Sequence, residues 1–292
     1  MTNLTEIGGT VQEYLWKYDN QAIAVAYETR GQGMPLLLLP AFSTVSSRDE
    51  MRGMAERLCD RFEVVALDWP GFGDSDRPGV QYGPEFYHLF LADFVSSVFP
   101  GPVAIVAAGH GAGYAMKLAK THPERVSKVV LVAPTWLGPL RIMGVPEPVR
   151  DFVRETVRTP GIGEFLYDLN THPAFLEFMY KQHVFVDPAK LTPEFIAQKR
   201  DSTQHPGGRF APVAFVTGTL DPAGDRQEIL AQFQPLLVPV KVIIGTLAPS
   251  GSQSVMEAVA QLPGVESARV AGSLGMHEEF PTAVVEAVGD FL

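Results

Sequence analysis

The sequence predicts an α/β protein in which helices cover both faces of a mostly parallel sheet and a helical segment interrupts the core. Three observations lead to this expectation. Short apolar runs alternate with segments of helical period over residues 1–135. The pattern then changes, and residues 136–235 are rich in charges and aromatic side chains at helical spacing. Apolar runs typical of strands return near residue 240, and a helical pattern closes the chain.

The individual elements follow from the period of the apolar residues. Strands are predicted where short apolar runs end at Gly, Pro or a polar turn, namely at Ile23–Thr29, Pro35–Pro40, Phe62–Leu67, Val103–Ala107, Val126–Val132, Val240–Ile244 and Ala268–Val270. Helices are predicted where apolar residues recur at spacings of three and four, namely within Ser47–Arg61, Glu85–Phe99, Gly113–His122 and Pro281–Leu292. The segment Pro212–Thr217 fits either a strand or a helix. We therefore expect a core formed by residues 1–135 and 236–292, with residues 136–235 as a helical cap.

Composition excludes several classes of function. The 292 residues carry 33 acidic and 23 basic side chains, a formal charge of −10, which argues against nucleic acid and anionic membrane surfaces as partners. No apolar run approaches the roughly 18 residues of a membrane span, and the first residues, MTNLTEIGGT, show no signal peptide. The single cysteine, Cys59, excludes an internal disulfide and a cysteine-rich metal site. We expect a cytoplasmic protein that binds a small molecule, without membrane insertion, metal or cofactor; any protein partner stays unknown.

Four motifs carry a resemblance to a known family. Asp68-Trp-Pro-Gly-Phe-Gly-Asp-Ser-Asp-Arg-Pro78 follows a predicted strand, and Gly109-His-Gly-Ala-Gly113 lies at a strand-to-helix turn. Thr121-His-Pro-Glu-Arg-Val126 ends the next helix, and His277-Glu-Glu-Phe-Pro281 precedes the last one. In this order they resemble the α/β-hydrolase superfamily, in the branch with a helical cap after the sixth strand. The resemblance covers nearly the whole chain and implies the α/β-hydrolase fold.

The same resemblance implies a catalytic triad, and the sequence departs from it at every position. The family places a serine at the centre of G-x-S-x-G, an acid after the seventh strand and a histidine after the eighth. The matching positions here are Gly111, Ala248 and Leu274, the last counted seven residues back from Pro281. His277 matches a second histidine that many members carry nearby.

The three replacements agree with one another physically. A side chain on the turn adopts a positive φ at a cost of roughly 1–3 kcal/mol, which Gly111 avoids. An acid without its histidine would be a buried, unpaired carboxylate, and Ala248 avoids that cost. Leu274 then fills the space with apolar atoms. We therefore expect no serine-type triad.

A second acid motif leaves an alternative open. Gly218-Thr-Leu-Asp221-Pro222 nearly repeats the segment that contains Ala248. Asp221 could pair with His277 and activate water directly as a general-base dyad. It could equally cap or open the helix expected at Arg226–Phe233.

Several other residues are candidates for the lining of a ligand pocket. By resemblance, the backbone N–H groups of Phe42 and Ala112 would form an oxyanion hole, which needs no side chain. His110 is expected to pack beneath the turn as a structural residue. Ser43 is a weak candidate for a substitute nucleophile, and Trp136 begins the cap.

Three hypotheses on function follow. The preferred one is a non-catalytic or diverged family member that binds a small, largely apolar molecule between cap and core. The alternative is a hydrolase or lyase in which His277 and a carboxylate activate water without a covalent intermediate. A third is a module whose cap surface binds another protein.

Overall fold

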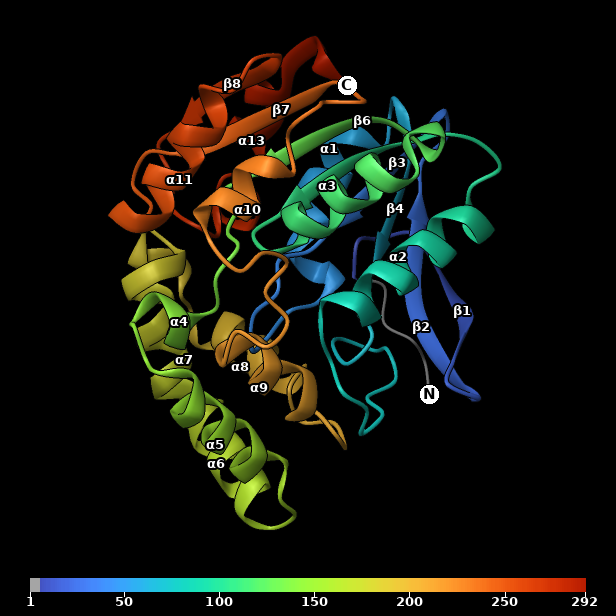
Figure 1. Ribbon diagram of the computed structural model, residues 1–292. Helices are drawn as coiled ribbons and strands as arrows, with labels where there is room; N and C mark the ends of the chain where they lie inside the picture. Colours follow the sequence, from blue (N-terminus) through green and yellow to red (C-terminus); the bar gives the residue numbers. More distant parts are fainter. Residues whose placement is uncertain (1–5) are drawn as a thin grey trace.

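The computed structural model describes residues 6–292 and contains one eight-stranded sheet of order β1-β2-β4-β3-β5-β6-β7-β8 (Figure 1). Its strands are β1 Thr10–Tyr18, β2 Gln21–Arg30, β3 Met34–Leu39, β4 Phe62–Leu67, β5 Val103–Ala108, β6 Val126–Val132, β7 Val240–Gly245 and β8 Val265–Val270. β1 and β2 pair antiparallel, as do β2 and β4, and every other pairing is parallel. The predicted α/β class is thereby confirmed. Residues 1–5 lie outside the described residues. They include part of the segment in which no signal peptide is expected.

All seven predicted strands are present. The sheet also contains β1, which was not predicted from the sequence. β1 has the sequence TVQEYLWKY, and only Trp16 is fully buried. It forms one edge of the sheet and pairs with β2 alone. An edge strand with one buried residue has no continuous apolar run, so the criterion that detected the central strands does not detect it.

Helices pack on both faces of the sheet. The core helices are α1 Arg52–Leu58, α2 Pro84–Val98, α3 Gly111–Thr121, α11 Ser250–Ala260, α12 Met276–Glu279 and α13 Pro281–Val288, with the 3-10 turn η1 Arg48–Met51 before α1. α10 Arg226–Ala231 belongs to the segment expected to be cap and contacts α11. α1 contacts α13 on one face, whereas α2 contacts α3 on the other. Both faces of β5 are buried in consequence, and all six of its residues are buried.

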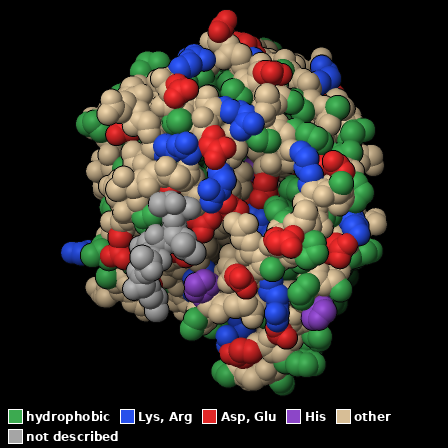
Figure 2. Space-filling model, turned by 180° about the vertical axis from the view of Figure 1, so that it is seen from behind, with side chains coloured by type: hydrophobic (Ala, Val, Ile, Leu, Met, Phe, Trp, Pro, Cys, Tyr) green, Lys and Arg blue, Asp and Glu red, His purple; other side chains and the backbone are tan. Residues whose placement is uncertain are grey.

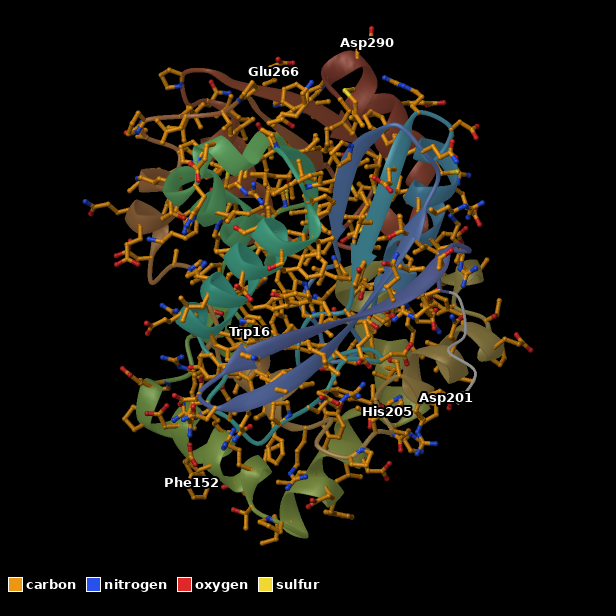
Figure 3. The ribbon with its side chains drawn as sticks, turned by 90° about the vertical axis from the view of Figure 1, so that its right-hand side faces the viewer. Trp16, Phe152, Asp201, His205, Glu266 and Asp290 are labelled. Carbon is orange, nitrogen blue, oxygen red and sulfur yellow. The ribbon has the colours of Figure 1, made fainter. Side chains whose placement is uncertain are left out.

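Further helices form the part of the molecule at the lower left of Figure 1. They are α4 Pro139–Ile142, α5 Glu147–Arg158, α6 Ile162–Asn170, α7 Pro173–Met179, α8 Pro193–Asp201 and α9 Phe210–Val216. The ambiguous segment Pro212–Thr217 is therefore mostly helical. Phe152 on α5 is 72% exposed and lies at the end of the molecule opposite Asp290 (Figure 3).

Two hydrophobic clusters organise the interior. The larger surrounds the sheet and also includes Ala211, Ala214 and Phe233, from the segment expected to be cap. The boundaries at residues 136 and 235 therefore remain a prediction. The smaller cluster joins the loop after β3 to the cap and consists of Val45, Leu176, Tyr180, Phe185, Leu191 and Ile196.

The surface mixes charges of both signs. Figure 2 shows acidic and basic side chains interspersed over one whole face, with hydrophobic side chains between them. Of the helices within residues 6–292, none has both the length and the apolar character needed to span a membrane.

Candidate functional site

The candidate site lies where the parallel strands end. Phe42 follows β3, Gly109 follows β5 directly, and Thr135 follows β6. Ala248 follows β7, and Leu274 follows β8. Because the carboxyl ends of parallel strands meet at one edge of a sheet, these loops come together there, which is the usual place for ligands in such folds.

The strained residue of the turn is Gly109, and the expectation of a positive φ at Gly111 is wrong. Gly109 has a φ of +50°, whereas Gly111 is the first residue of α3 and has no positive φ. β5 ends at Ala108, so the chain must reverse at the next residue before the helix begins. The residue that takes the family's nucleophile conformation is therefore Gly109.

A side chain at Gly109 would have no room. A Cβ atom built there would lie 2.8 Å from the Cβ of Ala41, well inside van der Waals contact, and 3.6 Å from Oγ1 of Thr135. Both the backbone conformation and the packing therefore favour glycine at the position where a serine nucleophile would project.

Backbone N–H groups remain available beside this turn. The N–H groups of Phe42 and His110 meet no acceptor within residues 6–292, and both residues are buried. The residue directly after the turn supplies one donor of an oxyanion hole in this fold, and here it is His110. Ala112 was expected in that role, but its N–H donates to the carbonyl of Gly109 at 3.2 Å in the first turn of α3. The expected donor pair is therefore corrected to Phe42 and His110.

Ala248 and Leu274, the positions expected for an acid and a base, also have apolar surroundings. Ala248 is buried and belongs to the larger hydrophobic cluster, and its N–H donates to the carbonyl of Gly245. Leu274 is half-buried and packs against the same cluster. Neither position presents a titratable group to the turn.

The proposed pair of Asp221 with His277 does not form. The Asp221 carboxylate accepts the N–H of Gly138 at 2.8 Å and a guanidinium N–H of Arg141 at 2.9 Å. It therefore fastens the start of α4 to the core. The alternative role as a helix cap is also wrong, because Asp225 is the residue whose side chain caps α10.

His277 pairs instead with Glu50, a residue that the sequence analysis did not single out. The Nε2 atom of His277 lies 3.1 Å from Oε2 of Glu50, and both side chains are buried. The same carboxylate oxygen accepts the N–H of Ala41 at 3.3 Å. Within residues 6–292, Nδ1 of His277 is buried and has no hydrogen-bond partner. The pair thus lies directly behind the loop that carries Phe42.

A buried ion pair from the cap lies next to this dyad. Nζ of Lys199, on α8, lies 2.6 Å from Oε1 of Glu278 and 3.6 Å from Oδ2 of Asp49. Burial opposes the charge on Lys199, but the facing carboxylates raise its pKa well above the usual value. The lysine is therefore charged, and it connects the cap electrostatically to α12 and η1.

His110 has both a hydroxyl and a carboxylate beside its ring. Its Nδ1 lies 2.6 Å from Oγ1 of Thr135, and its Nε2 lies 3.4 Å from Oδ1 of Asp221, without the alignment of a hydrogen bond. The ring also packs edge-on against Phe215. The expected packing at the turn is present, and Thr135 is a neighbour that no sequence pattern indicated.

The remaining candidates have local roles. Oγ of Ser43 accepts the N–H of Val45 at 3.1 Å, as in a turn. Trp136 is buried, and its ring lies 3.3 Å from the place of a Cβ on Gly113. Across the part of the chain that the structure describes, no group of three or more His, Cys, Asp or Glu side chains could hold a metal ion.

Comparison with known proteins gives the family. The sequence model of the alpha/beta hydrolase family matches residues 36–287, which include β4 to β8 in full and most of β3. The chain belongs to the alpha/beta hydrolase family. The fold expected from the sequence motifs is thereby confirmed.

Sequence comparison finds hydrolases and uncharacterized proteins among the relatives of this chain. A haloalkane dehalogenase from Agrobacterium fabrum is 26% identical over 201 residues, which cover 68% of this chain and 62% of the dehalogenase. A 2-hydroxy-6-oxo-6-(2'-aminophenyl)hexa-2,4-dienoic acid hydrolase from Metapseudomonas resinovorans is 26% identical over 46% of this chain and 47% of its own length. An uncharacterized protein of Mycobacterium tuberculosis is 32% identical over 37% of this chain and 31% of its own length. The matched part of the chain thus spans 31% to 62% of the length of these relatives.

Solved structures of other proteins share the fold over nearly the whole chain. An esterase from Thermogutta terrifontis matches with a TM-score of 0.73 at 20% identity, covering 97% of this chain and 98% of the esterase. An enol-lactonase from Burkholderia xenovorans LB400 matches with a TM-score of 0.70 at 18% identity, covering 92% and 96%. At this level of identity the likeness establishes the fold alone.

Proposed function

We propose that this family member binds a small, largely apolar molecule through a carbonyl or carboxylate oxygen, between cap and core, and performs no serine-type catalysis. The observation that carries the proposal is the pair of buried N–H groups of Phe42 and His110 beside a turn residue without a side chain. Buried backbone N–H groups are rarely left without an acceptor, so an oxygen atom from outside the chain is the natural occupant.

The surroundings support an apolar ligand. Ala248 and Leu274, at the positions where an acid and a base were expected, carry apolar side chains. The smaller hydrophobic cluster brings the cap against the loop after β3 through Val45 and Tyr180. Two N–H donors in apolar surroundings can hold an oxygen atom of a ligand, while the surrounding side chains favour contact with its hydrocarbon part.

Binding can be tested with simple ligands. We expect hexanoate to bind the purified protein saturably in calorimetric titration, and hexan-1-ol to bind at least about 10-fold more weakly because its oxygen is a poorer acceptor. 4-Nitrophenyl butyrate should show no sustained turnover above the buffer rate. Equal affinity for acid and alcohol, or sustained turnover at a rate ordinary for enzymes, about 1 per second or more, would contradict the proposal.

A second candidate function rests on the pair of Glu50 and His277. If the Nε2–H group of His277 donates to the Glu50 carboxylate, the lone pair on Nδ1 is basic and unpartnered. An imidazole held in this way is a general base for water, and a relative from Aeromonas hydrophila, a pimeloyl-[acyl-carrier protein] methyl ester esterase, supports an ester as its substrate. This is direct hydrolysis without a covalent intermediate.

The two candidate functions predict different effects of one substitution. Direct hydrolysis predicts ester turnover that falls about 100-fold or more in His277→Ala, the usual contribution of a general base. His205→Ala is the matched control, because His205 is exposed (Figure 3). Turnover that is equal in both variants would exclude His277 as the base.

A further inference from the structure

A hydroxyl, an imidazole and a carboxylate lie next to one another beside the turn at Gly109. Three different loops supply them. Thr135 follows β6, His110 lies between β5 and α3, and Asp221 follows α9. Oγ1 of Thr135 is 2.6 Å from Nδ1 of His110, and Nε2 of His110 is 3.4 Å from Oδ1 of Asp221. The residue types are those of a nucleophile, a base and an orienting acid.

Asp221 lies beside one ring nitrogen of His110, and Thr135 lies beside the other. Asp221 faces Nε2, and its carboxylate accepts the N–H of Gly138 and a guanidinium N–H of Arg141. In the tautomer that carries its proton on Nε2, this proton lies on the side of the Asp221 carboxylate, whose Oδ1 is 3.4 Å from Nε2. Nδ1 is then the acceptor for the O–H of Thr135, which is the tautomer that can remove a proton from the hydroxyl.

The hydroxyl lies beside the position at which the family's nucleophile would project. Oγ1 of Thr135 is 3.6 Å from the place that a Cβ on Gly109 would occupy. The N–H of His110, available to bind a carbonyl oxygen, belongs to the next residue of the same turn. Thr135 is partly exposed, whereas His110 and Asp221 are buried. The residue that carries the hydroxyl is therefore partly accessible, whereas its base is shielded from water.

We infer that Thr135 is an acyl-accepting hydroxyl, which takes the acyl group of a small activated ester with His110 as its base. Oγ1 attacks the carbonyl carbon, the new O–C bond forms, and the bond from that carbon to the leaving oxygen breaks. The proton of the hydroxyl passes to Nδ1 of His110 and from there to the leaving alkoxide or to water. The products are O-acyl-Thr135 and the free alcohol, and no oxidant or cofactor takes part.

This inference uses the carbonyl-binding role of the proposed function, but neither water activation by His277 nor repeated turnover. The test is acylation in a single turnover. The intact protein is mixed with 4-nitrophenyl acetate, and the modified residue is located by peptide mass mapping. We expect one acetyl group on Thr135 and a burst of one equivalent of 4-nitrophenolate.

Matched variants decide the assignment. Thr135→Val keeps the shape without the hydroxyl and should abolish the burst, whereas Thr135→Ser should keep it at the same position. His110→Gln should slow the burst about 100-fold or more. Thr159→Val, at an exposed threonine of the cap, should leave it unchanged.

Other outcomes overturn the inference. Acetylation confined to lysine side chains, or a burst that persists in Thr135→Val, would show that Thr135 is not the acceptor. A burst at Thr135 that is unchanged in His110→Gln would show that the imidazole is not its base. Failure of hexanoate to bind would remove the proposed function but leave acetylation of Thr135 in place, so the two can fail separately.

Discussion

His277 on α12 and Glu50 on η1 form a buried pair in which Nε2 of the imidazole lies 3.1 Å from Oε2 of the carboxylate. The residues are 227 positions apart in the sequence, so the pair joins the last part of the chain to the loop after β3. Because the same oxygen of Glu50 accepts the N–H of Ala41, the pair also fixes the backbone that leads to Phe42. Its geometry therefore bears on both stability and the candidate site.

Removal of Glu50 should be costly. Glu50→Ala leaves His277 and the N–H of Ala41 without their acceptor, and we expect the free energy of unfolding to fall by about 3–5 kcal/mol. Glu50→Gln keeps an acceptor oxygen and should cost less. Urea denaturation provides the measurement, with Glu56→Ala, at an exposed residue, expected to change stability by no more than about 0.5 kcal/mol. Equal losses in Glu50→Ala and Glu56→Ala would show that the pair does not stabilise the fold.

Serine at the turn should be unfavourable for two separable reasons. Gly109→Ser combines a positive φ with the contact to Ala41, so we expect a loss above the roughly 1–3 kcal/mol of backbone strain alone. Gly144→Ser has a φ of +73° and open space, so it measures the strain without the contact. Gly111→Ser, at a helical φ, should cost least. Chemical denaturation of the three variants provides the measurement. A result in which Gly111→Ser is the most destabilised variant would contradict this account.

Asp221 should fasten the cap to the core. Asp221→Ala removes the acceptor of Arg141 and of the N–H of Gly138, and hydrogen bonds to charged groups contribute about 1.5–3 kcal/mol each. We expect lower stability and faster proteolysis within residues 139–216. Asp225→Ala, which removes only the cap of α10, should cost about 1 kcal/mol. A protease pattern identical to that of the unaltered protein would argue against the fastening role.

His88 should make stability depend on pH. Burial, followed by the charge of Lys117, lowers the pKa of His88 from 6.5 to about 4. Between these values the unfolded chain binds a proton that the folded chain does not. This contribution is therefore present in full above pH 6.5 and is lost as pH falls toward 4, by up to about 3 kcal/mol.

The measurement is urea denaturation from pH 7 to pH 4. His88→Phe should flatten the dependence in that range, and Phe suits the site because the ring of His88 packs 4.9 Å from that of Tyr114. His183→Ala, at an exposed histidine, should keep the slope of the unaltered protein. A slope that persists in His88→Phe would assign it to other groups.

The sequence predicted the central sheet because buried parallel strands are continuous apolar runs. Val126–Val132 and Phe62–Leu67 have the predicted bounds, whereas the exposed edge strand β1 carried no such signal. The triad positions were assigned by motif and spacing, which identified the loops but misplaced the strained glycine by two residues. That difference depends on where β5 ends and α3 begins, which only the backbone shows.

The pairings of the site could not be predicted from spacing. Glu50 lies in a segment of helical period that gives no sign of a carboxylate facing His277, and Thr135 follows a strand in an ordinary loop. Both contacts arise from packing between segments far apart in the chain. Asp221 was singled out by its motif, but both roles expected of it were wrong, because its partners Gly138 and Arg141 come from the start of α4.

The central claim is that the backbone N–H groups of Phe42 and His110 bind an oxygen atom of a ligand. The most direct measurement is an amide-resolved NMR titration of the protein with hexanoate. We predict that the amide resonances of Phe42 and His110 shift saturably and together, while that of Ala112, already bonded to Gly109, moves little. Saturable shifts confined to other amides, or none at all, would contradict the claim.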